Sequence, residues 1–245
     1  MAGHSKWKNI QVRKGAQDIK KGKDFTKAAK DLILAAKAGG GDPVHNATLR
    51  TAIAKAKAVN LPKDKIDQAI KKGTGELAGG DLYEVMYEGY APGGVAIMVE
   101  AATENKNRSA ADIRHLISKG GGNMGEPNCV GWMFDRKGVI SFDAAKYTED
   151  QIMEAGLEAG ADDVVSEGDS IEVYTAVEHF AAVQKAFEDA EMAFENAELT
   201  LIPQNLVAVD ATAGQKILNL IEKLEEYEDV QNVYVNADFP DELMG

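Results

Sequence analysis

The spacing of apolar residues changes along the sequence at Asp81. Before this point, apolar side chains recur every three or four residues, as at Phe25, Ala29 and Leu32, which is typical of amphipathic helices. After it, the runs LYEVMYEGYA and VAIMVEAATE, separated by the turn sequence PGG, are typical of two strands. A chain with both patterns must combine a helical part with a part that contains sheet.

Capping residues and helix breakers divide the first part into three helices. Asp24 and Asn46 are good N-cap residues, and Pro62 is suited to the first turn of a helix. Gly39 and Gly73 are typical helix ends. We therefore expect a small three-helix bundle followed by a linker. The expected helices are 24–39, 46–60 and 62–73, and the linker is 74–80.

The second part alternates between strand and helix patterns, with hairpins among them. Helices are expected at 107–120, 149–159, 177–190 and 213–227. Besides the first two strands, we expect a hairpin from CVGWMF and GVISFD, and strands at 162–175, 199–209 and 230–237. This mixed order predicts α+β domains, with helices on antiparallel sheets, rather than a doubly wound sheet.

Charge is distributed unevenly between the two parts. The whole chain of 245 residues has a net charge of -13. Residues 1–75 contain 17 basic and 6 acidic side chains, whereas residues 76–245 contain 10 and 34. The first part therefore has a net charge of +11 and suits a phosphate-rich partner, while the second, at -24, would be repelled by it.

Residues 1–23 are rich in basic side chains and have no sustained apolar period, so we expect a basic arm, in which Trp7 lies between two lysines in sequence. Trp7 is suited either to stacking on a base or to packing on the bundle as an anchor. The lysines have two interpretations, a solvated face or a nucleic-acid contact, and their concentration favours the contact. The candidate nucleic-acid-binding residues are Lys6, Trp7, Lys8, Arg13, Lys14, Lys20, Lys21, Lys23, Lys27, Lys30 and Arg50.

A glycine-rich segment matches the pattern G-x-G-x-x-G of dinucleotide-binding sites. That site requires a strand before the glycines and a helix after them, and here the order is reversed. The segment is better interpreted as a helix end followed by a flexible loop, which could approach RNA closely. The residues of this possible RNA-approaching loop are Gly120, Gly121, Gly122, Asn123, Met124 and Gly125.

The common catalytic and metal-binding motifs are missing from the sequence. There is no P-loop, nucleophile elbow or metalloprotease helix, and the four histidines have no zinc-ligand spacing. Cys129 falls in the expected strand and is interpreted as a small core residue. We expect no cofactor and no metal. The single cysteine and the lack of a secretory or membrane-spanning segment predict a cytoplasmic protein.

Several long motifs resemble the YebC family. They are MAGHSKW, GGGDP, YEGYAPGGVAIMVEAATENKNRSAADIRH, GGNMG, VGWMF and KGVISF. The resemblance implies three domains, a three-helix domain followed by two α+β domains, with the last inserted in the middle one. The implied division is a basic arm at 1–23, a bundle at 24–75, a middle domain at 81–130 plus 207–245, and an inserted domain at 131–206.

The resemblance also implies a role in gene expression. Some members of the YebC family are described as transcriptional regulators that bind DNA, and others act on ribosomes. We expect a non-enzymatic nucleic-acid-binding protein, with a ribosome-associated translation factor that relieves stalling as the leading hypothesis. A DNA-binding transcriptional regulator is the alternative, and an enzyme acting on a small molecule is a further one.

Overall fold

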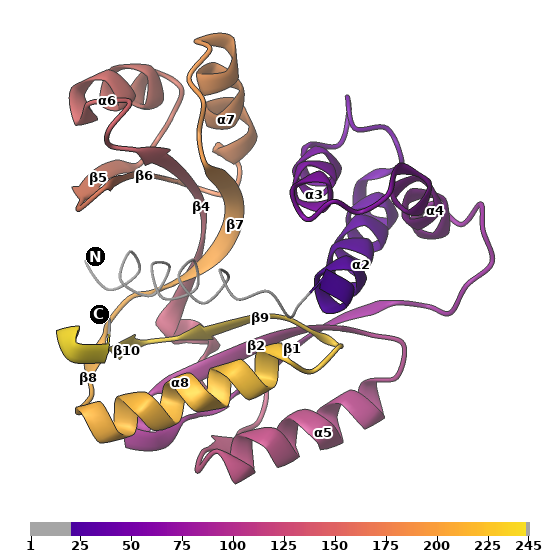
Figure 1. Cartoon of the computed structure of the whole chain (residues 1–245), viewed down its shortest axis with the longest axis vertical. Coiled ribbons are helices and arrows are strands. Elements are labelled where there is room, and N and C mark those ends of the chain that lie inside the picture. The colour runs from indigo at the N-terminus through magenta and orange to yellow at the C-terminus, as the bar shows by residue number, and fades with distance from the viewer. Residues whose placement is uncertain (1–20, 244–245) are drawn as a thin grey trace. The chain divides into compact units, whose positions relative to one another are not determined.

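The computed structural model describes residues 21–243, and these fall into two compact units (Figure 1). One unit is Phe134–Gln204, and the other contains residues 21–133 and 205–243. The architecture is α+β, with an N-terminal three-helix domain followed by two α+β domains, the second of which is inserted in the first. The predicted fold class is confirmed.

The N-terminal domain is a bundle of three helices, as predicted. Asn46 caps the second helix, because its side chain accepts a hydrogen bond from the backbone N–H of Leu49 at 2.9 Å. The first helix begins at Lys21, three residues before the expected Asp24. The helices are α2 (Lys21–Gly39), α3 (Ala47–Ala58) and α4 (Lys63–Gly73). Their shared core includes Leu32, Leu49, Ala52, Ala56, Ile66 and Ala69.

The middle domain is built on the predicted antiparallel hairpin, in which Tyr83 lies opposite Thr103. The strand β9, which follows the insertion in the sequence, pairs with β2, which precedes it. The middle domain is therefore made of two segments of the chain. Two helices cover one face of this sheet (Figure 1). The strands of the sheet, in spatial order, are β3 (Asn123–Met124), β1 (Tyr83–Tyr90), β2 (Ala96–Thr103) and β9 (Val230–Val235). The covering helices are α5 (Lys106–Lys119) and α8 (Ala211–Glu225), and a short parallel pair is formed by β8 (Val207–Ala208) and β10 (Ala237–Asp238).

The inserted domain is a four-stranded antiparallel sheet with two helices packed on one face. Its core is centred on Phe142, whose ring lies 4.7 Å from that of Phe187 in an edge-to-face arrangement. The strands, in spatial order, are β5 (Asp163–Glu167), β6 (Ser170–Thr175), β4 (Phe134–Asp143) and β7 (Asn196–Pro203). The helices are α6 (Glu149–Glu158) and α7 (Phe180–Asp189).

Three strand predictions are corrected by the structure. The expected hairpin of CVGWMF and GVISFD is wrong, because residues 134–143 form one continuous strand and Gly131–Met133 form a short 3-10 helix. The run 162–175 is two strands that turn at Gly168, which has the left-handed φ of 59° that glycine allows. The run 199–209 divides into β7 and the separate β8.

Candidate nucleic-acid interface

Lysines of the bundle are exposed on all three of its helices. Six lysine side chains of the bundle are exposed, so each can bind a phosphate without a large desolvation cost. The exposed lysines are Lys37, Lys55, Lys57, Lys63, Lys65 and Lys71. The structured part of the chain therefore contributes its own positive surface, beyond the residues that the sequence singled out.

Most of the predicted contact residues lie outside the part of the chain that the structure describes. These are Lys6, Trp7, Lys8, Arg13, Lys14 and Lys20, and the side chains of Lys21 and Lys23, at the start of α2, are not described either. For all eight, a role in nucleic-acid binding stays a prediction.

Lys27 and Arg50 are half-buried on α2 and α3. The Nη1 atom of Arg50 donates to the backbone carbonyl of Pro43 at 3.2 Å, and its buried Nε atom has no hydrogen-bond partner among residues 21–243. Lys27 interacts with other groups of the protein.

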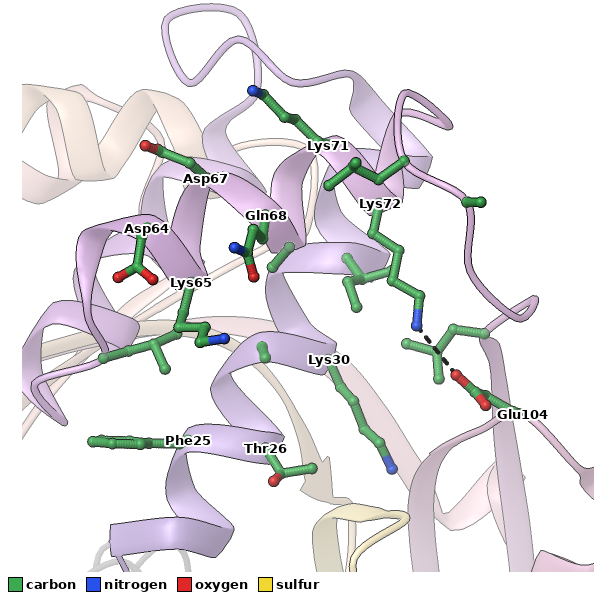
Figure 2. Close-up of a pocket in the computed structure, with 17 residues that line it drawn as sticks. Phe25, Thr26, Lys30, Asp64, Lys65, Asp67, Gln68, Lys71, Lys72 and Glu104 are labelled. Atoms are coloured by element: carbon green, nitrogen blue, oxygen red, sulfur yellow. Dashed lines mark hydrogen bonds and ion pairs between the residues drawn. The ribbon is translucent and has the colours of Figure 1, made fainter.

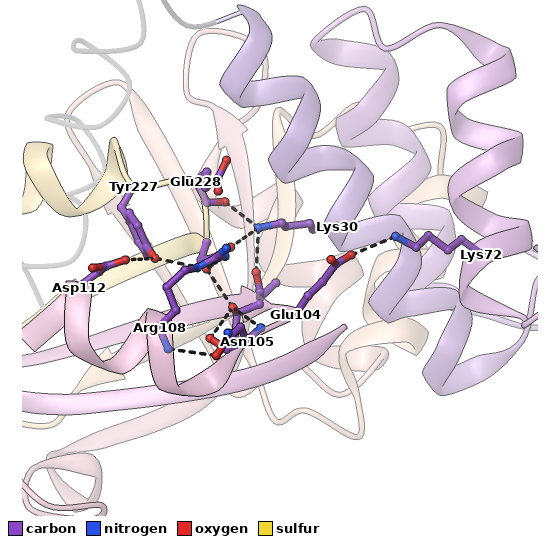
Figure 3. Close-up of polar contacts among 11 residues, drawn as sticks. Lys30, Lys72, Glu104, Asn105, Arg108, Asp112, Tyr227 and Glu228 are labelled. Carbon is purple, nitrogen blue, oxygen red and sulfur yellow. Dashed lines mark hydrogen bonds and ion pairs between the residues drawn. The ribbon is translucent and has the colours of Figure 1, made fainter. Parts of the chain in front are cut away.

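Lys30 is directed into the protein. Its ammonium group donates to the carbonyl oxygens of Ala102 and Glu228 and to the carboxylate of Asp229, each at 2.8 Å (Figure 3). An ammonium group has three hydrogens, and all three are used here. In this arrangement Lys30 has no donor left for a phosphate, so it joins the helical domain to the middle domain instead.

Asp229 is the centre of this junction, and its side chain is only 3% exposed. Besides Lys30, it accepts hydrogen bonds from the guanidinium group of Arg108 at 2.9 Å and from the hydroxyl group of Thr103 at 2.9 Å. Burial alone would raise the pKa of Asp229, but the hydrogen bonds from Lys30, Arg108 and Thr103 outweigh it and lower the pKa below its ordinary value. The carboxylate is therefore held in its charged form.

Tyr227 extends the network away from the bundle. Its hydroxyl group donates to the carboxylate of Asp112 at 2.7 Å and lies 3.5 Å from Asp229 (Figure 3). Burial raises the pKa of Tyr227, and the hydrogen bond to Asp112 raises it further. The hydrogen bond and charge of Asp229 raise the pKa of Arg108. Tyr227 is therefore neutral and Arg108 charged near neutral pH.

Two weaker contacts surround this junction. Lys72 of α4 lies 3.2 Å from the carboxylate of Glu104, and both side chains are partly exposed. The ring of Tyr83 lies beneath two ammonium groups, with that of Lys106 at 4.5 Å and that of Lys37 at 5.6 Å from its centroid. Such contacts are individually small, so the buried Asp229 cluster dominates the polar part of the junction.

A groove of about 990 Å³ lies beside the junction, between α2, α4 and the segment 77–82 (Figure 2). Its lining is mainly apolar, with Phe25, Ile33 and Leu61 among the groups that form it. Lys65 and Gln68 extend from α4 toward the groove (Figure 2), and Asp64, Asp67 and Lys71 of the same helix line it as well. An apolar lining with a basic group at its edge can accept a ligand that has a flat ring and a negatively charged group beside the ring.

The glycine segment after α5 is ordered by pairing with the first strand. Asn123 and Met124 form β3, opposite Tyr90 and Gly89, and the N–H of Gly125 donates to the carbonyl oxygen of Glu88 at 2.8 Å. The expected flexible loop is thus a short sheet edge. A Cβ atom on Gly122 would collide with the carbonyl oxygen of Tyr90, so the chain passes too closely there for any other residue. Whether this loop approaches RNA stays a prediction.

The carboxylate of Glu88 shapes the next loop. Its two oxygens accept hydrogen bonds from the N–H groups of Asn128, Val130 and Gly131 at 2.9, 3.0 and 2.6 Å. These amides would be needed for sheet pairing, which explains why CVGWMF is not a strand. As a result Trp132, which a buried strand would have enclosed, is 66% exposed.

Cys129 lies in this loop and not in the expected strand, and it is half-buried. Burial raises the pKa of its thiol, and the negative charge of Glu88 raises it further. The thiol is therefore protonated at neutral pH, which is the opposite of what an activated cysteine requires.

Within residues 21–243, no group of three or more His, Cys, Asp or Glu side chains is placed to hold a metal ion. None of the helices described by the structure has the length and apolar character required to cross a bilayer.

The fold and this site define a class of three-domain α+β proteins in which a basic helical domain is followed by two α+β domains that are predominantly acidic. The chain belongs to the TACO1/YebC family, as its motifs indicated. Residues 5–76 match the N-terminal domain of that family, and residues 82–237 match its second and third domains.

Relatives and a solved structure agree with this assignment. The chain is 68% identical to a protein of Maridesulfovibrio salexigens over 100% of this chain and 98% of that relative. It is 62% identical to a protein of Solidesulfovibrio magneticus over the full length of both. Both relatives are named "Probable transcriptional regulatory protein". The crystal structure of a conserved hypothetical protein, Aq1575 from Aquifex aeolicus, matches with a TM-score of 0.82 and 42% identity, over 91% of this chain and 92% of that one.

Proposed function

We propose that this protein is a non-enzymatic, nucleic-acid-binding regulator of gene expression that acts in the cytoplasm as a ribosome-associated translation factor. The basic arm and bundle contact ribosomal RNA, and the complex helps a stalled ribosome to resume. No base-specific reading is required for such a role, because the contacts are mainly with phosphates.

The observation that carries this proposal is the separation of charge between domains. Residues 1–75 have a net charge of +11, whereas the inserted unit, residues 134–204, contains 17 acidic and 4 basic side chains. A polyanion attracts the first region and repels the second, so the protein binds in one orientation. Ribosomal RNA is a large polyanionic surface that suits such oriented binding.

Within the basic region, the proposed contact groups are those of the arm, which include Lys21 and Lys23, together with Lys27 and Arg50 of the bundle. Lys30 is not included, because its three hydrogens are already donated to protein acceptors. The exposed lysines of the bundle, such as Lys55 and Lys57, are added to the surface. The loop at Gly120–Gly125 offers a second approach to RNA, since Gly121 and Asn123 are exposed.

The alternative function is a DNA-binding transcriptional regulator. It is favoured by one specific observation, the name "Probable transcriptional regulatory protein" carried by relatives that match the whole chain. The same basic surface would then meet duplex DNA. The two functions differ in the preferred polyanion, which can be measured directly.

The test is co-sedimentation with ribosomes over a salt series, beside binding to duplex DNA. The full chain is compared with a chain lacking residues 1–20, which leaves α2 complete from Lys21. A second comparison uses the double substitution Lys55→Gln and Lys57→Gln in the bundle. Its matched control is Lys146→Gln and Lys185→Gln in the inserted unit, where both lysines are also exposed.

We expect ribosome binding near physiological salt that depends on the arm and exceeds the affinity for DNA. Each lost phosphate contact should lower the salt slope by about 0.7 to 0.9. The Lys146 and Lys185 control should bind like the unchanged protein. Tight duplex binding without ribosome association would select the transcriptional alternative, and binding to neither would refute both.

A further inference from the structure

We propose that the groove between α2, α4 and the segment 77–82 holds one unstacked base of a single-stranded nucleic acid. This inference rests on the proposed function and deepens it, because it specifies which form of nucleic acid the bundle binds. It predicts that the bundle prefers single strands and RNA loops over duplexes.

The groove is large enough to admit a base, and its lining suits one. Its volume of about 990 Å³ lies within the range of about 300 to 1,000 Å³ that is typical of small-molecule clefts. The lining includes the apolar side chains of Ala29, Ile33 and Leu82. Phe25, which is half-buried, contributes an aromatic ring at one end of the groove (Figure 2). Bases stack on such rings with little dependence on sequence.

A polar group is available for the edge of the base. Gln68 is exposed on α4 and extends toward the groove (Figure 2). A side-chain amide both donates and accepts hydrogen bonds, so it can meet any of the four bases. This matches a site that binds a base without selecting its identity.

The positive charge of the whole helical region suits the phosphates beside that base. Lys65 lines the groove and is exposed, and the ammonium group of Lys72 is neutralised in part by Glu104 at 3.2 Å. Lys71 lines the groove as well, and so do the acidic residues Asp64 and Asp67 of the same helix, so the charges of the lining itself nearly balance. The net charge of +11 over residues 1–75 concentrates polyanions at this domain, which favours nucleic acid over an apolar peptide as the occupant.

A duplex cannot use the groove, because its bases are paired and stacked inside the helix. A single strand or an RNA loop can turn one base outward at a much lower cost. The groove therefore separates single strands from duplexes, whereas the lysines attract both. This difference makes the inference testable independently of the proposed function.

The experiment uses the full chain and a ten-nucleotide RNA with one central 2-aminopurine, alone and annealed to its complement. Binding is measured by anisotropy, and the environment of the base by 2-aminopurine fluorescence. Phe25→Leu removes the ring but keeps an apolar side chain, and Phe194→Leu in the inserted unit is its control. Lys65→Gln is paired with Lys63→Gln, since both lysines are exposed on α4 but only Lys65 lines the groove.

We expect the unchanged protein to bind the single strand more tightly than the duplex and to raise the 2-aminopurine fluorescence. Phe25→Leu should weaken single-strand binding about tenfold and suppress the fluorescence change, as loss of a stacking partner predicts. Lys65→Gln should lower the salt slope by about 0.7 and reduce the fluorescence change. Phe194→Leu and Lys63→Gln should leave the fluorescence change intact.

The inference is overturned if the Phe25→Leu and Lys65→Gln variants bind the single-stranded RNA as tightly as their controls and change the 2-aminopurine fluorescence by the same amount. If ribosome binding still depends on the arm in that case, the proposed function stands. The groove would then bind a protein segment and not a base. Equal affinity for single strand and duplex, without a fluorescence change, also overturns it. The exposed Lys65 and Lys63 pair keeps the test decisive even if Phe25→Leu loosens the bundle.

Discussion

Two regions of the middle domain each contain a buried carboxylate, but they use it differently. Asp229 is 2% exposed and Glu88 is 7% exposed. The carboxylate of Asp229 is neutralised by Lys30 and Arg108, two cations from different helices. That of Glu88 accepts its hydrogen bonds from three backbone amides between Asn128 and Gly131.

The difference shows what each kind of partner does. Cations on separate elements allow Asp229 to join the helical domain to the sheet, and the contact then depends on charge and pH. Amides from one short segment allow Glu88 to fix the path of a loop, and that contact depends on the geometry of two acceptor oxygens. The first region should therefore respond to any loss of charge, and the second to an isosteric change.

The largest effect is expected for Asp229→Ala. Lys30, at 15% exposure, would retain a charge with no counterion, and breaking a buried pair in this way costs about 3 to 5 kcal/mol. Amide exchange in α2 and thermal unfolding should both show the loss. Asp67→Ala, an exposed aspartate of α4, is the control and should change little. Unaltered protection of α2 in Asp229→Ala would show that Lys30 is not important for holding the helix.

A smaller and more local effect is expected for Glu88→Gln. One of the two acceptor oxygens becomes an NH2 group, which faces a backbone N–H and leaves it unpaired at a cost of about 1 to 3 kcal/mol. Hydrogen exchange should accelerate at Val130 and Gly131, and the fluorescence of Trp132 should change. Glu84→Gln, an exposed glutamate of the same strand, is the matched control. Equal exchange rates in both variants would contradict the role given to Glu88.

The parts of the fold that were predicted correctly depend on local signals. Asn46 accepts from the N–H of Leu49 only three residues away, and the PGG turn joins two adjacent strands. Apolar spacing reports directly on which face of such an element is buried. The three bundle helices, the four helices of the α+β domains and the first hairpin could therefore be predicted from the sequence.

The junction could not be predicted because its partners are distant in the sequence. Lys30 lies 199 residues from Asp229, and the sequence alone grouped it with Lys27 among the candidate nucleic-acid contacts. Glu88 and Val130 are 42 residues apart, and the apolar letters of CVGWMF resemble a strand unless that contact is known. In the sequence, Asp229 is one of several acidic residues before the last strand, and nothing in its neighbourhood indicates burial.

The pH dependence of stability should distinguish the two regions. The folded-state pKa of Asp229 is lowered, so its stabilising contribution is complete above the unfolded-state value of about 3.9 and is lost as the pH falls toward the lower folded-state pKa. Unfolding by urea between pH 6 and pH 3 should show this loss in the unchanged protein. Asp229→Asn should remove that part of the pH dependence, whereas Glu88→Gln should keep it. An identical pH profile for Asp229→Asn and the unchanged protein would contradict the assignment.

The smallest effect is expected for Lys72→Gln, which breaks the contact with Glu104. This pair also joins the helical and middle domains, but its side chains are 31% and 56% exposed, compared with 15% and 3% for Lys30 and Asp229. Exposed pairs contribute about 0 to 1 kcal/mol, because water solvates each charge when the partner is lost. A double-mutant cycle with Glu104→Gln, measured by thermal unfolding at low and high salt, gives the coupling. A coupling as large as that of the buried pair would mean that burial does not set the strength of these contacts. A small, salt-sensitive coupling would leave Asp229 as the group that holds the basic bundle to the sheet.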